Sequence, residues 1–219
     1  MVLAVVFSIA LSSVCHAHHS PGAGKSTISA EAARSLIGYD VLRQHHFLHL
    51  DLDVCVPQWM RDNFSKGVYP TLQQRADFMS NTSHFVKGEI ITVHQKAPRP
   101  LIVIVSFSFV NTDLRAAFRD AFPDAHWILV DTHKDLAQER ILCREGHFYK
   151  AESLNNSEVA KNSSNETISE WEFQPVDFPH VLLDGRDTVD TNAKLLLEFI
   201  ERSVLHQSTT IVTQLPLIP

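Results

Sequence analysis

The sequence predicts a single α/β domain in which a parallel sheet of five strands lies between two layers of helices. Short apolar runs that end in polar or acidic residues alternate along the chain with longer segments of helical spacing. A glycine-rich turn stands directly before the first helical segment. Strands and helices that alternate in this way form right-handed βαβ units, and the 219 residues suit one such domain.

The N-terminal segment, residues 1–18, allows more than one interpretation. Val2–Leu11 is almost entirely apolar, too short to span a bilayer, and followed at Val14–Ala17 by small residues like those of a signal-peptide cleavage site. The first strand is either 14–18, or 2–11 followed by a longer loop. Cleavage after Ala17 would remove every residue able to form this strand, so we favour a retained, buried segment.

The segment Pro21-Gly22-Ala23-Gly24-Lys25-Ser26-Thr27 follows the Walker A pattern G-x-x-x-x-G-K-[ST], except that His19 replaces its first glycine. In such a phosphate-binding loop the backbone N–H groups point at phosphate oxygens, and a helix beginning near Lys25 directs its positive end at the same anion. Lys25 would contact the β- and γ-phosphates, and the hydroxyl of Ser26 would bind magnesium. The alternative is an ordinary turn before a helix. The helical run after the turn favours the phosphate loop, and with it the P-loop NTPase fold.

The second strand is expected at 46–53, because a short apolar run there ends in acids. Asp51 and Asp53 are two residues apart, so strand alternation sends both side chains to one face, or lets one reach into the site while the other holds water or magnesium. One of the two carboxylates could accept the proton of a substrate hydroxyl. The alternative is that a strand-end acid caps the next turn. We expect His45, His46 and His49 to pack or lie at the surface.

The other elements follow from apolar spacing and from proline and glycine breaks. We expect strands at 101–105, 126–131 and 180–185, and helices at 57–64, 71–95, 111–122, 134–144 and 191–204. For the long helix, the residues expected to face inward are Leu72, Ala76, Met79, Phe85, Ile90 and Val93.

Two arginines precede a polar segment rich in Asn, Ser and Glu. Arg140 and Arg144 are four residues apart and share a helix face, so their guanidinium groups suit phosphate oxygens or a base. Surface ion pairs with Glu139 and Glu145 are the alternative. We predict a lid at about 145–174, inserted in a domain that covers 19–205, followed by a loose tail at 206–219.

The run Arg140–Phe148 resembles the R-L-x-x-R-x-G-H-F lid signature of gluconate kinases, within the wider group of shikimate-kinase-like and nucleoside-monophosphate-kinase-like P-loop proteins. Asp51-Leu52-Asp53 resembles their D-x-D strand end, and Val105–Ser108 is similar to their V-S-C-S strand end. Residues 67–75 are similar in layout to their G-x-P-L-x-x-x-D-R substrate segment. The resemblance covers roughly residues 19–200.

This resemblance implies an ATP- and Mg²⁺-dependent kinase for a small acidic or polyol substrate, with gluconate as one candidate. By this resemblance, Lys25 and Ser26 would bind phosphate and magnesium, and Asp51 or Asp53 would contact the acceptor hydroxyl. Arg75 would bind an acidic substrate. Arg140 would contact adenine and Arg144 the phosphates. The departures from the family pattern are His19, Gln74 and Asn111. Gln74 and Asn111 bear on the identity of the substrate. His19, together with the two possible positions of the first strand, favours the alternative function, a catalytically weak P-loop protein that binds a nucleotide or a partner.

Charge and cysteine content narrow the expected partners and compartment. The net charge is −6 and no basic cluster is present, which argues against nucleic-acid binding. The three cysteines, Cys15, Cys55 and Cys143, form no evident disulfide framework, so we expect the cytoplasm. The secretory pathway is the alternative, if residues 1–17 are a cleaved signal peptide. We expect a small-molecule substrate and no membrane span.

Overall fold

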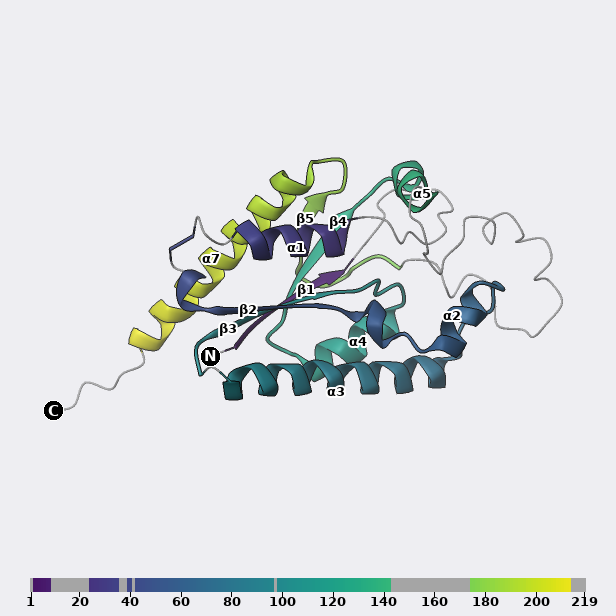
Figure 1. Cartoon of the computed structure of the whole chain (residues 1–219), viewed down its shortest axis with the longest axis horizontal. Helices are drawn as coiled ribbons and strands as arrows, with labels where there is room; N and C mark the ends of the chain where they lie inside the picture. Colours follow the sequence, from purple (N-terminus) through teal and green to yellow (C-terminus); the bar gives the residue numbers. More distant parts are fainter. Residues whose placement is uncertain are drawn as a thin grey trace.

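The computed structural model describes residues 2–8, 24–35, 39–40, 42–96, 98–142 and 174–213. These residues form five strands with helices between them (Figure 1). In chain order the elements are β1 (Val2–Ser8), α1 (Lys25–Ser35), η2 (Leu42–Gln44), β2 (His46–Asp51), η3 (Leu52–Cys55), α2 (Gln58–Phe64), α3 (Leu72–Lys96), β3 (Leu101–Ser106), α4 (Thr112–Ala121), β4 (His126–Asp131), α5 (Lys134–Leu142), β5 (Val181–Asp184) and α7 (Val189–Thr213).

The strands form one parallel sheet in the order β2-β3-β1-β4-β5. β1 lies between β3 and β4, with Val2 opposite Leu101 and Val5 opposite His126. The structure therefore places the first strand within 2–11, and the other expected position, 14–18, lies outside the described residues. A chain shortened after Ala17 would lack the strand that joins the two halves of the sheet.

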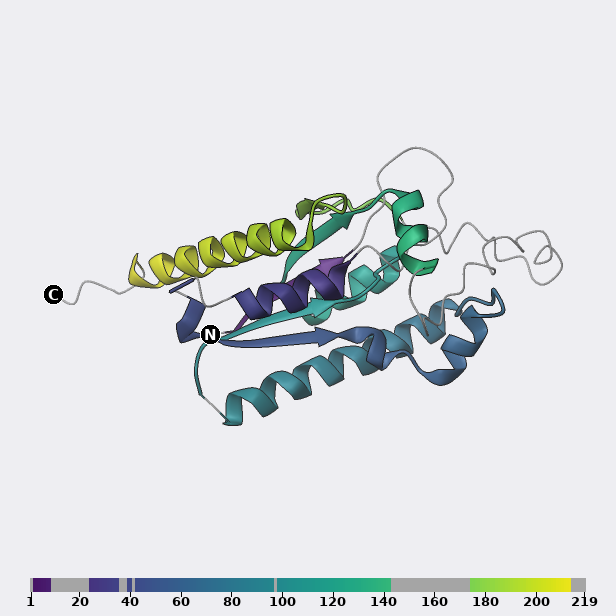
Figure 2. The ribbon, with the colours of Figure 1, turned by 45° about the horizontal axis from the view of Figure 1, so that its top comes forward.

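Helices cover both faces of the sheet, which gives the predicted three layers. Figures 1 and 2 show α1 and α7 on one face and α3 and α4 on the other. The side chains of β3 alternate between these layers. Ile102 and Ile104 pack in the core beneath α1 and α7, whereas Leu101, Val103 and Val105 pack in the core beneath α3 and α4. Every residue of β3 is buried, as expected of a strand covered on both faces.

The predicted inward face of the long helix α3 was partly wrong. Met79 is buried as expected, but Leu72 is 62% exposed and Phe85 37% exposed. The buried stripe of α3 includes Thr82 and Ser83 beside Phe78, Met79 and Val86. Ile90 and Val93 also pack against the core as expected, whereas Ala76 is exposed. Because two polar residues lie on the inward face, apolar spacing alone identified only half of the predicted residues correctly.

The last helix is longer than predicted. α7 continues to Thr213, well beyond the expected end at Val204 and into the segment predicted to be a loose tail. The predicted lid at about 145–174 lies outside the described residues, apart from Gln174. In the described part of the chain, no helix has the length and apolar character needed to cross a membrane.

Candidate functional site

The amino end of α1 forms one side of the candidate site. Gly24 has a φ of +86°, a conformation that glycine adopts without strain, and its carbonyl accepts the Ile28 N–H at 2.8 Å to begin the helix. Lys25, Ser26 and Thr27 form the first turn, with Thr27 exposed. The loop residues that precede Gly24, namely His19, Pro21, Gly22 and Ala23, lie outside the described residues.

Lys25 extends from α1 to the carboxyl end of β3. Its side chain is largely buried, and its ammonium donates to Ser108 Oγ at 3.1 Å. Ser108 stands two residues after Ser106, the last residue of β3. The positive charge of Lys25 and the positive end of the α1 dipole therefore lie at the same edge of the sheet, an arrangement that suits an anion.

Ser26 contacts the end of β2 at the same edge of the sheet. Its hydroxyl donates to Asp51 Oδ2 at 2.5 Å and lies 3.5 Å from the hydroxyl of Ser106. Asp51, Ser106 and Ser26 thus bring oxygen atoms from β2, β3 and α1 together. Hydroxyl and carboxylate oxygens are the ligands that Mg²⁺ prefers, so the meeting of Ser26 with Asp51 fits the predicted magnesium site.

A metal held here would depend on its ligand for further coordination. Among the described residues no group of three or more His, Cys, Asp or Glu side chains could hold a metal ion. Mg²⁺ is usually bound in proteins by one or two carboxylates together with substrate phosphates and water. The single carboxylate of Asp51 beside Ser26 therefore suits a magnesium–nucleotide complex better than a resident metal ion.

Asp53 does not share a strand face with Asp51. β2 ends at Asp51, and Asp53 lies in the 3-10 turn η3, so strand alternation does not apply to it. Asp51 Oδ1 instead accepts the N–H of Asp53 at 3.1 Å and caps η3. The expectation that alternation places both carboxylates on one face was wrong, and Asp51 both caps the next turn and contacts Ser26.

Arg61 of α2 holds η3 from the other side. Its Nε donates to the carbonyl of Val56 at 2.9 Å, and its Nη2 donates to the carbonyl of Asp53. These bonds fix the backbone that carries Asp53, whose side chain is half-buried. The sequence interpretation gave Arg61 no role, because its partners are carbonyl groups that no sequence motif marks.

His49 is a second residue that the sequence interpretation missed. It lies on β2 two residues before Asp51, and its Nε2 is 3.2 Å from Ser106 Oγ. Burial lowers the pKa of His49, and the nearby Asp51 carboxylate only partly offsets this effect. Strand alternation could have identified the residue, since His49 and Asp51 share one face of β2.

Arg75, predicted to bind an acidic substrate, makes contacts inside the protein. It is buried near the start of α3, where its Nε donates to Asp113 Oδ2 at 2.8 Å and its Nη1 to the carbonyl of Pro70 at 3.0 Å. Asp113 lies in the first turn of α4. These bonds join the segment before α3 to α4, so the substrate role of Arg75 stays a prediction.

Arg140 lies between the start of α1 and the turn after β5. Its Nη2 donates to the carbonyl of Gly185 at 3.0 Å, and a Cβ atom added to Gly24 would lie 3.9 Å from its Nη1. The predicted nucleotide-binding arginine is thus close to the predicted phosphate loop. Arg144, the other arginine of the pair, lies outside the described residues.

The fold is similar to that of several solved kinases. A sugar kinase from Janibacter sp. HTCC2649 superposes with a TM-score of 0.56 at 17% identity, covering 91% of this chain and 95% of its own. A gluconokinase from Sinorhizobium meliloti 1021 gives 0.53 at 15% identity, covering 94% and 97%. The Mycobacterium tuberculosis APS kinase, solved in complex with AMPPNP and APS, gives 0.54 at 18% identity, covering 91% and 98%.

These likenesses establish the fold rather than a particular family. No protein-family model matches the chain, and no curated protein sequence matches it. The resemblance to gluconate kinases therefore remains a hypothesis, which the similarity to a solved gluconokinase supports at the level of fold.

Proposed function

We propose that this protein transfers the γ-phosphoryl group of ATP to a hydroxyl of a small acidic or polyol metabolite. The observation that carries the proposal is the convergence of Lys25, Ser26 and Asp51 with the two serines at the end of β3. A cation, a helix amino end and hard oxygen ligands at one edge of a parallel sheet suit a nucleotide's terminal phosphates.

Each side chain has a role that follows from its chemistry. Lys25 would neutralise charge on the β- and γ-phosphates, as transfer through a loose transition state requires. Ser26 and Asp51 would hold Mg²⁺, which supplies charge neutralisation and orientation of the phosphates when bound. Asp53, carried by the turn that Asp51 caps, would accept the proton of the attacking hydroxyl.

The arginines would bind the two substrates. Arg140, which contacts the turn after β5, would lie against the adenine of ATP, and Arg144 over the phosphates. Arg75, which lies beside the segment similar to the family's substrate segment, would meet an acidic acceptor. The acceptors named for the similar folds are a sugar, gluconate and APS, and gluconate stays one candidate for this chain, with a role in carbohydrate metabolism.

A second candidate function is nucleotide or partner binding without efficient catalysis. The observation that favours it is His19 at the position of the first loop glycine. An imidazole side chain there would crowd a loop whose N–H groups approach phosphate oxygens closely. The first candidate requires both nucleotide binding and turnover, whereas the second has no efficient turnover and binds a nucleotide or only a partner. For both, we propose a cytoplasmic location.

Turnover of ATP with a panel of sugar acids and polyols tests the proposal, with Lys25→Met as the diagnostic variant. Loss of one positioned cation at the transferred group should lower kcat/KM by about 100-fold or more, with little change in thermal stability. Lys194→Met, an exposed lysine on α7 that pairs with Glu198, is the matched control and should keep full activity. Equal turnover by Lys25→Met and the wild type would refute the assigned role. Nucleotide binding without turnover of any acceptor would favour the second candidate.

A further inference from the structure

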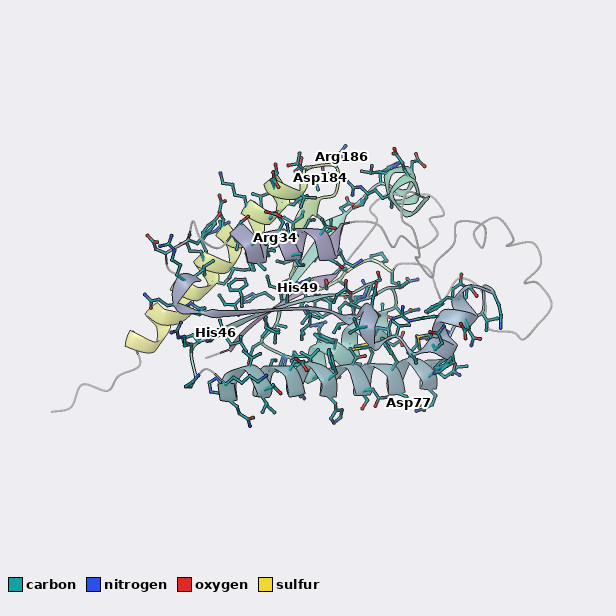
Figure 3. All side chains as sticks on the ribbon, viewed as in Figure 1. Arg34, His46, His49, Asp77, Asp184 and Arg186 are labelled. Carbon is teal, nitrogen blue, oxygen red and sulfur yellow. The ribbon has the colours of Figure 1, made fainter. Side chains whose placement is uncertain are left out.

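A histidine contacts one of the serines beside the candidate magnesium site. On β2, His49 lies on the same sheet face as Phe47 and Asp51, because side chains two residues apart share a face. This is the face that α1 covers, since Phe47 packs in the core beneath α1 and α7. Figure 3 shows His49 on this strand, in the middle of the molecule. Its Nε2 contacts Ser106 Oγ at 3.2 Å, and Ser106 in turn lies 3.5 Å from Ser26 Oγ.

Counting protons fixes the direction of these contacts. A hydroxyl group has one proton to donate and two lone pairs that accept, whereas a carboxylate only accepts. Ser26 uses its proton on Asp51 Oδ2, so Ser106 is the donor to Ser26. With the Ser106 proton directed at Ser26, the contact between Ser106 and His49 needs Nε2 as the donor. The chain runs in one direction, from His49 through Ser106 and Ser26 to Asp51.

This direction has a consequence for Ser26. Its oxygen donates to Asp51 and accepts from Ser106, which occupies the proton and one lone pair. The second lone pair remains for a cation. Were Ser106 to turn its proton toward His49 instead, the Ser26 oxygen would lose this second partner and keep only its bond to Asp51. A donor at His49 Nε2 therefore keeps the Ser106 proton directed at Ser26, which holds the Ser26 oxygen from a second side.

We propose that His49 is a positioning residue that, through Ser106, orients the Ser26 hydroxyl for Mg²⁺ in the nucleotide complex. The inference rests on the proposed function, because it needs a magnesium–nucleotide complex at Ser26. In this proposal only the Nε2–H donor of His49 orients Ser106. Another neutral side chain with an N–H donor at the same position should therefore have the same effect. Partners that orient a metal ligand typically change metal affinity by about 10- to 100-fold when they are removed.

The test measures AMPPNP affinity by calorimetry, once with excess Mg²⁺ and once with EDTA, so that it needs no turnover. The dissociation constant in EDTA divided by that in Mg²⁺ reports the contribution of the metal to binding. His49→Leu should lower this ratio by about tenfold and leave the affinity in EDTA unchanged. His49→Gln places an amide N–H near the position of Nε2 and should keep the ratio close to that of the wild type.

Ser106→Ala removes the intermediate hydroxyl and should reproduce the effect of His49→Leu. Because the two residues act in one chain, the double variant should lose no more than either single one. Should His49→Leu fail to fold, Ser106→Ala and His49→Gln decide the question. His46→Gln, on the opposite face of the same strand, is the matched control and should leave both constants unchanged.

The outcomes separate this inference from the proposed function. A wild type that does not bind AMPPNP, or binds it equally with Mg²⁺ and EDTA, would overturn the proposed function and this inference with it. A wild type with strong magnesium dependence that His49→Leu and Ser106→Ala both retain would overturn only the inference. Equal weakening of binding in Mg²⁺ and in EDTA would also overturn it, because this result indicates general damage to the site.

Discussion

The turn after β5 offers a sharp test of how closely the carboxyl ends of β4 and β5 approach. The N–H of Gly185 donates to the carbonyl of Asp131 at 2.5 Å. A Cβ atom on residue 185 would lie 1.9 Å from Thr132 Oγ1, 2.7 Å from Thr132 Cβ and 2.7 Å from the Asp131 oxygen. All three distances are far below van der Waals contact, and one of them is to backbone, so rotation of a side chain cannot relieve the clash.

Gly185→Ala should therefore destabilise the protein by about 3 kcal/mol, the upper part of the range for overpacking a well-filled site. Urea unfolding followed by circular dichroism measures this as a lower midpoint with an unchanged slope. Gly88→Ala is the matched control, since Gly88 lies inside α3 with no atom within 4 Å of the added methyl. It should stabilise the protein by about 0.5–1 kcal/mol.

A second substitution separates the clash from other effects. Adding Thr132→Gly to Gly185→Ala removes the Oγ1 and Cβ contacts and leaves only the Asp131 oxygen. The double variant should be more stable than the sum of the single effects predicts, because the two positions share one contact. A loss below about 1 kcal/mol for Gly185→Ala, or no such coupling, would refute the reasoning.

Three further predictions concern single side chains. Burial lowers the pKa of His126 in the folded protein, where the ring packs against Phe199, so the unfolded chain binds more protons and stability falls as the pH drops below about 6.5. When the pH is lowered from about 7.5 to about 5.5, the melting temperature of His126→Phe should therefore fall less than that of the wild type. An equal fall in both proteins would contradict this. Arg75→Met should destabilise the protein by about 2 kcal/mol in urea, since it leaves the partly buried Asp113 without its ion pair, and a stability equal to the wild type would contradict it. Gly24→Ala should weaken AMPPNP binding and lower stability by about 1–2 kcal/mol, because Gly24 has a φ of +86°; unchanged stability and binding would contradict the assigned strain.

The parallel sheet could be predicted from the sequence because each strand is a short, isolated apolar run. Residues 101–106 are buried on both faces, and such a run between prolines and a helix has few other structures available. The first strand was harder, since both 2–11 and 14–18 stand before the glycine turn. The choice depends on pairing, and Val2–Phe7 pairs residue by residue with Leu101–Ser106 of β3.

The helix faces and the strand ends were less predictable, for two physical reasons. In α3, Thr82 and Ser83 occupy the buried stripe, so apolar periodicity pointed to Leu72 and Phe85, which are exposed. At the end of β2, the carboxylate of Asp51 bonds the N–H of Asp53 and turns the chain into η3, where the period of two no longer applies. Local hydrogen bonds of this kind are not visible in the pattern of apolar residues.

In the candidate site, the motif residues could be predicted and their partners could not. Lys25, Ser26 and Asp51 follow from recognisable patterns, and the structure brings them to one edge of the sheet. His49 and Ser106 become part of the site only because β2 and β3 pair with Asp51 opposite Ser106. Strand order and register therefore carry information about the site that no local motif contains.

The most direct test of the central claim is hydrogen–deuterium exchange of the full chain with and without ADP and Mg²⁺. A nucleotide held at the carboxyl edge of the sheet should slow exchange in 24–30 and in 106–108, which contain Lys25 and Ser108, and leave the opposite edge around His46 and Leu101 unchanged. Protection confined to the opposite edge, or none at saturating nucleotide, would contradict the placement of the site.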